Sequence, residues 1–215
     1  MNVKIKICGI RDEETLEAVI DAGADFFGLV FFPRSPRHVD MDTAARLAAR
    51  ARGRIAIVAL TVDADDSLLR EIARRIRPDF LQLHGSETPE RASDISKIME
   101  SPMIRAFRIR SAQDLEAVRT WHGRMAFPLF DAWVDEARAQ GLPGGTGHAF
   151  DWSLLGDRDG DFMLAGGLTP ENVGEAIRIT GAPMVDVSSG VEKARGVKDP
   201  ERIRAFVQAA RSAAS

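Results

Sequence analysis

The sequence predicts an α/β fold, a single-domain (β/α)8 barrel that spans residues 1–215. Short apolar runs alternate with longer amphipathic segments along the chain. Eight such units share 215 residues, so each has about 27, near the ~30 of a strand–helix–strand unit. Because no linker, low-complexity stretch or charge block divides the sequence, we expect one domain.

Eight short runs rich in valine, isoleucine, leucine or phenylalanine are the predicted strands. They cover residues 3–8, 26–31, 54–60, 80–83, 103–107, 125–130, 162–165 and 184–187. Such runs are typical of parallel strands that are buried on both faces. Because helical segments separate them, the strands are expected to form one parallel sheet with the helices outside it.

Seven amphipathic segments are the predicted helices, and a weaker one lies near residues 151–155. The seven cover residues 12–22, 42–50, 67–76, 89–99, 112–121, 170–180 and 200–213. In the first, Leu16, Val19 and Ile20 share a helical face and Gly23 follows as a stop signal. The alternative fold, an open doubly wound sheet, usually has fewer strands and a Gly-x-Gly-x-x-Gly turn after the first, which residues 8–11 lack.

The composition is that of a soluble globular chain, with 45% hydrophobic and 28% charged residues and a net charge of -3. This balance gives no sign of a nucleic-acid partner. Without a run of ~20 apolar residues or a signal-peptide pattern, we expect a cytoplasmic protein with no membrane partner. One cysteine cannot form an internal disulfide, and four histidines without close pairing predict no metal site.

The carboxyl ends of the strands are where barrels of this kind carry their chemistry. In the first strand Lys6 and Cys8 share one face and Ile5 and Ile7 the other. Because the isoleucines are expected to meet the helices, Cys8 should lie at the mouth of the barrel, with Lys6 about 7 Å below it. A lone cysteine there is either a small buried hydrophobic residue or a base whose thiolate a nearby cation favours.

A carboxyl group is expected at the mouth of the barrel from the sixth strand. Phe127, Leu129 and Asp131 share one face, so Asp131 should lie above an apolar wall. Such surroundings suit a general acid. The alternative is an aspartate that caps the turn after the strand.

Glycine-rich loops at the last strands predict a phosphate site. The loops after strands seven and eight form the phosphate site of many such barrels, and glycines there leave backbone N–H groups approachable. The candidates are Gly166, Gly167, Ser189 and Gly190. Thr169 and Pro170 are predicted as the N-cap and first residue of the next helix. Gly145, in the glycine-rich residues 144–147, is a further phosphate candidate or part of a hinge.

Two other polar side chains are candidates with open alternatives. Arg37 lies in a loop held by Pro33 and Pro36, and its guanidinium either grips a carboxylate with two bonds or belongs to a solvated basic loop. His84, on the face of the fourth strand that also carries Gln82, is a catalytic histidine or a hydrogen-bonded structural one.

Taken in order, these motifs form a specific combination. They are KICGI (6–10), FPRSPR (32–37), QLHG (82–85), Asp131 followed by GGTG (144–147), FDW (150–152), AGGL (165–168) and DVSSGVE (186–192). Over essentially its whole length, the chain resembles the phosphoribosylanthranilate isomerase family of tryptophan biosynthesis. The resemblance implies a phosphate-binding TIM barrel that needs no metal or organic cofactor.

The resemblance also implies an Amadori rearrangement of N-(5-phosphoribosyl)anthranilate to 1-(2-carboxyphenylamino)-1-deoxyribulose 5-phosphate. It places the general acid at Asp131, which protonates the ring oxygen, and the general base at Cys8, which removes the C2 proton of the sugar. It places the anthranilate carboxylate on Arg37. Asp186 matches a residue near the ribose, or it pairs with Lys6 as a structural ion pair inside the barrel.

The expected partner is a small sugar-phosphate substrate, and the chain is expected to be a monomer or a homodimer. One alternative is another phosphate-binding barrel enzyme of the tryptophan or histidine pathways, including an isomerase with two substrates. The acidic residues 61–66 argue against the latter, whose second phosphate would need another glycine-rich loop there. The other alternative is a non-catalytic sugar-phosphate-binding barrel, which would need neither Cys8 nor Asp131.

Overall fold

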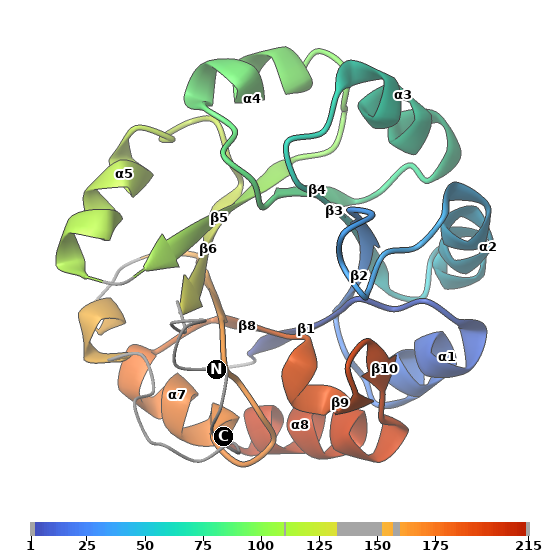
Figure 1. Cartoon of the computed structure of the whole chain (residues 1–215). Coiled ribbons are helices and arrows are strands. Elements are labelled where there is room, and N and C mark those ends of the chain that lie inside the picture. The colour runs from blue at the N-terminus through green and yellow to red at the C-terminus, as the bar shows by residue number, and fades with distance from the viewer. Residues whose placement is uncertain (1–2, 110, 133–151, 157–159, 214–215) are drawn as a thin grey trace.

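The structure, a computed structural model, describes residues 3–109, 111–132, 152–156 and 160–213. Eight strands close into a barrel in the order β1 to β8, and β8 pairs with β1 (Figure 1). Every neighbouring pair in the barrel is parallel. The helices surround this ring, which confirms the predicted (β/α)8 fold.

All eight predicted strands are present. They are β1 (Lys4–Cys8), β2 (Phe26–Phe31), β3 (Ala56–Thr61), β4 (Phe80–Leu83), β5 (Met103–Ile109), β6 (Phe127–Ala132), β7 (Met163–Ala165) and β8 (Met184–Val187). The bounds of β2, β4 and β8 are as predicted. β6 begins and ends two residues later than predicted, so Asp131 lies within the strand and pairs in register with Arg108 of β5.

The helices follow the predicted order. They are α1 (Glu13–Asp21), α2 (Met41–Ala51), α3 (Asp66–Arg75), α4 (Pro89–Ile95), α5 (Glu116–Arg119), α7 (Val173–Thr180) and α8 (Pro200–Ala213). Three short 3-10 helices also occur, η1 (Ala112–Leu115), η2 (Trp152–Leu155) and η3 (Ser189–Val191). The predicted helix over 112–121 is thus divided between η1 and α5. Along the described part of the chain, no helix combines the length and apolarity that a membrane crossing requires.

The continuous helix after β7 begins later than predicted, at Val173 rather than Pro170. Thr169 nevertheless makes the bonds of the predicted cap: its hydroxyl accepts from Glu171 N at 3.2 Å and its carbonyl from Val173 N at 3.0 Å. In return, the Asn172 side chain accepts from Thr169 N at 2.8 Å, and it donates to Gly167 O at 2.9 Å. A capped turn over 169–172 therefore leads into α7.

The core has two layers that the strand pattern separates. Ile5 and Ile7 are fully buried in the layer between strands and helices, as expected. A second cluster of apolar side chains fills the barrel interior with Phe26, Val58, Ile104, Ala106, Phe127, Leu129, Met163, Ala165 and Met184. This packing forms a solid floor, so open space is available only near the ends of the strands.

A hairpin that the sequence analysis did not predict follows β8. Its strands are β9 (Glu192–Ala194) and β10 (Val197–Lys198), and they pair antiparallel. Gly196, in the turn, has a φ of +79°, and a Cβ at this position would lie 2.6 Å from Pro36 O. The hairpin therefore packs closely against the loop after β2, which carries Arg37.

Candidate active site

A cavity of about 580 Å³ lies at the carboxyl ends of the barrel strands. Its lining comes from β1, β2, β3, β4, β5, β6, β7 and β8 or the loops that follow them. The predicted site residues that line it are Cys8, Arg37, Asp131, Gly166, Gly167, Asp186 and Ser189. Gly145 lies outside the described residues. Gly190 does not line the cavity itself but directly follows Ser189, which does.

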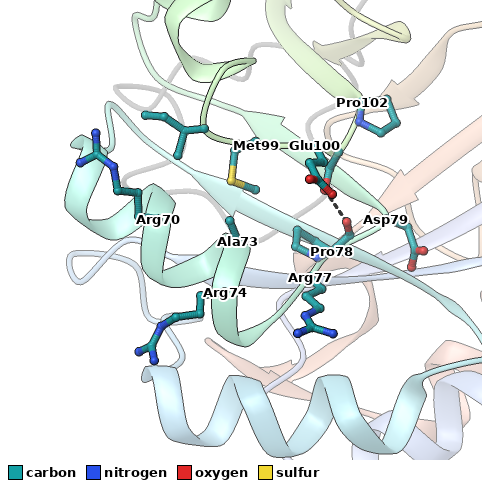
Figure 2. A pocket seen from close by; sticks show the side chains of 11 residues that line it. Arg70, Ala73, Arg74, Arg77, Pro78, Asp79, Met99, Glu100 and Pro102 are labelled. Atoms are coloured by element: carbon teal, nitrogen blue, oxygen red, sulfur yellow. Dashed lines mark hydrogen bonds between the residues drawn. The ribbon is translucent and has the colours of Figure 1, made fainter.

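A second recess, of about 660 Å³, lies between the end of α3 and the segment that precedes β5 (Figure 2). Figure 2 shows Arg70, Arg74 and Arg77 beside it, and the Ser101 hydroxyl donates a hydrogen bond to Pro78 O. This recess is at the amino ends of β4 and β5. Because barrels carry their chemistry at the opposite end, we assign the site to the cavity that contains Cys8.

Cys8 ends β1 and is only 4% exposed, yet it lines the cavity. Its side chain packs against β2, because a Cβ added to Gly28 would lie 2.8 Å from Cys8 Sγ. Burial raises the pKa of the thiol and dominates over the opposing charges of Lys6 and Lys198, which lower it. The thiol is free, and the charges of both lysines act on it.

Lys6 is fully buried below Cys8 and forms an ion pair with Asp186. The distance from Lys6 Nζ to Asp186 Oδ1 is 3.0 Å. Burial opposes the charge of Lys6, but the carboxylate of Asp186 outweighs it and raises the pKa of the ammonium. The structural ion pair considered from the sequence is therefore present, and Asp186 lines the cavity as well.

Asp131 is paired with His84 at the rim. The distance between His84 Nε2 and Asp131 Oδ2 is 3.3 Å, and Gln82 Nε2 lies 3.0 Å from His84 Nδ1. The roles of the ring nitrogens depend on the tautomer: with Gln82 Nε2 donating to Nδ1, the neutral imidazole carries its hydrogen on Nε2, which faces Asp131. Phe127 and Leu129 belong to the apolar cluster inside the barrel, as predicted, and Ala165 is part of the same cluster.

Arg37 is held in place by the hairpin after β8. Its Nε donates to Glu192 Oε1 at 2.6 Å and its Nη2 to Glu192 Oε2 at 2.9 Å. Burial alone would raise the pKa of Glu192, but hydrogen bonds from Arg37, Gly196 N and Lys198 lower it to about 2. The solvated basic loop considered for Arg37 is therefore wrong, and its guanidinium is fixed beside the cavity.

The two glycine loops meet at one side of the cavity. Gly166 and Gly167 have φ values of +86° and +65°, which favour glycine. A Cβ added to Gly190 would lie 1.8 Å from Leu168 O, so the loop after β8 touches the loop after β7. The structure thus brings together all the described candidates for the phosphate site.

Several residues of the site were missed from the sequence. Gly28 and Lys198 belong to no motif that was given a role, and Glu192 was quoted only as part of a motif. The sequence alone does not show whether a lysine is buried or exposed. Gly196, a turn residue within the short segment 192–198, is a signal that could have indicated the hairpin.

The fold and this site define a phosphate-binding barrel enzyme with a thiol and a carboxyl group at one cavity. A family described as N-(5'phosphoribosyl)anthranilate (PRA) isomerase matches residues 5–209. N-(5'-phosphoribosyl)anthranilate isomerases of Brucella canis and Brucella abortus are 50% identical over 211 residues, which cover 97% of this chain and 94% of theirs. The chain belongs to the phosphoribosylanthranilate isomerase family.

Solved structures agree with this assignment. The phosphoribosyl anthranilate isomerase of Thermotoga maritima has a TM-score of 0.86 at 32% identity, with 98% of this chain and 99% of that chain covered. A phosphoribosyl anthranilate isomerase in complex with reduced 1-(o-carboxyphenylamino)-1-deoxyribulose 5-phosphate has a TM-score of 0.83 at 30% identity and the same coverage. A further relative, from Jonesia denitrificans, is 34% identical with a TM-score of 0.82, and covers 99% of this chain and 98% of that one.

The contact between Cys8 and Gly28 predicts the effect of a single methyl group. In Gly28→Ala the new methyl would overlap the thiol, so we expect kcat/KM to fall about 10- to 100-fold, since a 1 Å displacement can have an effect of this size. Steady-state kinetics measures it. Gly174→Ala, whose Cβ meets neighbouring atoms only at 3.6 Å or more, is the matched control. Equal kinetics in the two variants would contradict the close packing of the thiol.

Proposed function

We propose that this chain catalyses the Amadori rearrangement of N-(5-phosphoribosyl)anthranilate to 1-(2-carboxyphenylamino)-1-deoxyribulose 5-phosphate, a step of tryptophan biosynthesis. The observation that carries this proposal is that Cys8 of β1 and Asp131 of β6 line one cavity. A buried base and an acid at one substrate are what an aldose–ketose isomerisation requires. The bound product analogue in a family relative supports the same substrate class.

Asp131 is the proposed general acid of the first step. Its proton goes to the furanose ring oxygen, the bond from this oxygen to C1 breaks, and the nitrogen lone pair forms the iminium. His84 orients the carboxyl group through the contact of Nε2 with Oδ2. Gln82, which is fully buried, holds the other ring nitrogen of His84 and so determines which way the imidazole faces.

Cys8 is the proposed general base of the second step. The iminium acidifies the C2 proton and the thiolate takes it. The electron pair of the broken C–H bond forms the C1–C2 double bond of an enol, while the second bond between C1 and nitrogen breaks and its electron pair returns to the nitrogen. The enol then becomes the ketone as C1 gains a proton and the C2 hydroxyl loses one. Lys6 favours the thiolate that this step needs, since its charge lowers the pKa of the thiol.

Binding groups are proposed on three sides of the cavity. Arg37 takes the anthranilate carboxylate, because its guanidinium is already fixed by Glu192 and lines the cavity. An apolar wall for the aromatic ring lies beside it and consists of Val30, Phe32, Leu60 and Val62. The phosphate is assigned to Gly166, Gly167, Ser189 and Gly190, with Gly145 as a further contributor, and Asp186 takes the ribose side.

We propose that the chain acts in the cytoplasm on a small sugar phosphate, as a monomer or a homodimer. A homologous structure is of monomers generated from a dimeric isomerase of Thermotoga maritima, so the barrel of that relative occurs in both states. The site lies within one chain: every residue assigned a role here comes from the same barrel.

Cys8→Ser tests the base. A hydroxyl is a far weaker base than a thiolate at neutral pH, so we expect kcat to fall about 10²- to 10⁴-fold. The fluorescence of the aminoaldose follows turnover, and titration with the reduced product analogue should show nearly unchanged affinity. Wild-type turnover in this variant would remove Cys8 from the mechanism.

Asp131→Asn tests the acid. The amide keeps the shape of the side chain but cannot protonate the ring oxygen, so kcat should again fall about 10²- to 10⁴-fold with binding of the product analogue retained. Asp63→Asn, at the carboxylate after β3, serves as a control for the loss of one negative charge near the rim. A twofold decrease in Asp131→Asn would exclude the acid role.

Arg37→Ala tests the carboxylate contact. If the contact is equal in the ground and transition states, KM should rise about 10- to 100-fold with little change in kcat. Because the substitution also removes one of the two cations that pair with the buried Glu192, the double variant Arg37→Ala with Glu192→Gln separates binding from stability. A KM near the wild-type value in both variants would show that Arg37 does not bind the substrate.

A further inference from the structure

Lys198 is a buried cation next to the site, and the mechanism above gives it no place of its own. It lies in β10, is 5% exposed and does not line the cavity. Its ammonium donates to Ser188 O at 2.9 Å, to Ser188 Oγ at 3.1 Å and to Glu192 Oε1 at 2.9 Å. All three N–H groups are therefore used within the protein, so the ammonium acts on the site through its neighbours and its charge.

The first effect of Lys198 is on the end of β1. The pairing of β1 with β8 ends at Ile7 and Val187. The Ser188 hydroxyl then donates to Cys8 O at 3.0 Å, which extends the connection by one residue. Because Lys198 holds both oxygens of Ser188, it fixes the hydroxyl that in turn fixes the backbone of Cys8.

The second effect is electrostatic. Three charged groups act on the thiol of Cys8: Lys6 on β1, Asp186 on β8 and Lys198 on β10. The charge of Lys6 is balanced by Asp186, only 3.0 Å away, so this pair contributes little net charge. Lys198 and Arg37 instead share the single carboxylate of Glu192, which leaves an excess of positive charge on this side of the thiol.

We propose that Lys198 is a positioning residue of the isomerisation, whose ammonium holds the loop after β8 against the end of β1 and favours the ionised thiol of Cys8. The proposal rests on the role of Cys8 as the general base. It also explains why a hairpin after β8 belongs to the active-site end of the barrel. The hairpin carries both Glu192, which holds Arg37, and Lys198, which acts on Cys8.

The pH dependence of Cys8 alkylation by iodoacetamide tests this proposal without using the isomerase activity. Cys8 is the only cysteine of the chain, so the rate reports one thiol. Burial raises the pKa of this thiol and Lys198 lowers it. In Lys198→Met the midpoint of the rate profile should therefore move up by about one pH unit, and kcat should fall more than KM rises.

Two variants control for a merely structural effect. Lys193→Met removes an exposed lysine of the same hairpin and should leave both the alkylation profile and kcat at their wild-type values. Lys198→Arg keeps the positive charge and should leave the midpoint of the profile close to its wild-type value. If both Lys198 variants moved the midpoint equally, the charge would not be the cause and the proposal would fail.

Lys198→Met leaves Glu192 with one cation fewer, so its folding is checked by circular dichroism. If it does not fold, the titration is made on Lys198→Gln, whose amide can still donate to Glu192 and Ser188 but carries no charge. An unshifted profile in either folded variant would overturn the role of Lys198 and leave Cys8 as the base. Wild-type turnover in Cys8→Ser would instead overturn the base assignment and leave the shifted profile in place.

Discussion

The pairing of β8 with β1 closes the barrel, and the site depends on this closure. It places Asp186 beside Lys6 and Ser188 beside Cys8, although about 180 residues separate the partners in the chain. Parallel pairing around the ring also brings the carboxyl ends of β1 and β6 to one cavity. An open sheet would leave β1 and β8 apart and would separate these groups.

The charges of the site form two groups of different net charge. Lys6 and Asp186 neutralise each other in the barrel interior, whereas Arg37 and Lys198 share Glu192. Burial raises the pKa of the Cys8 thiol, which makes its thiolate a stronger base but a less populated one. The excess positive charge works in the opposite direction, so the basicity of Cys8 is a balance between desolvation and the nearby ammonium groups.

The sequence was sufficient to predict the strands, their order and the residues at their ends, because apolar runs and turn glycines are local signals. For the same reason, it predicted that the side chains of Lys6 and Cys8 face the interior of the barrel. It did not predict the hairpin after β8, the fixed state of Arg37 or the start of α7 at Val173. The first two depend on contacts between loops, such as Glu192 with Arg37, and the third on hydrogen bonds within the segment after β7, such as Asn172 with Gly167.

By itself, then, the sequence determined a barrel of eight strand–helix units, with a thiol, a carboxyl group and glycine loops at its mouth, and a resemblance to one family of isomerases. Only the tertiary structure decided which ionic partners these groups have. A residue type and its spacing determine on which face of a strand a side chain lies, since that is a property of the backbone. Which charge lies beside it, and how far water is excluded, depends on segments that meet only when the ring closes.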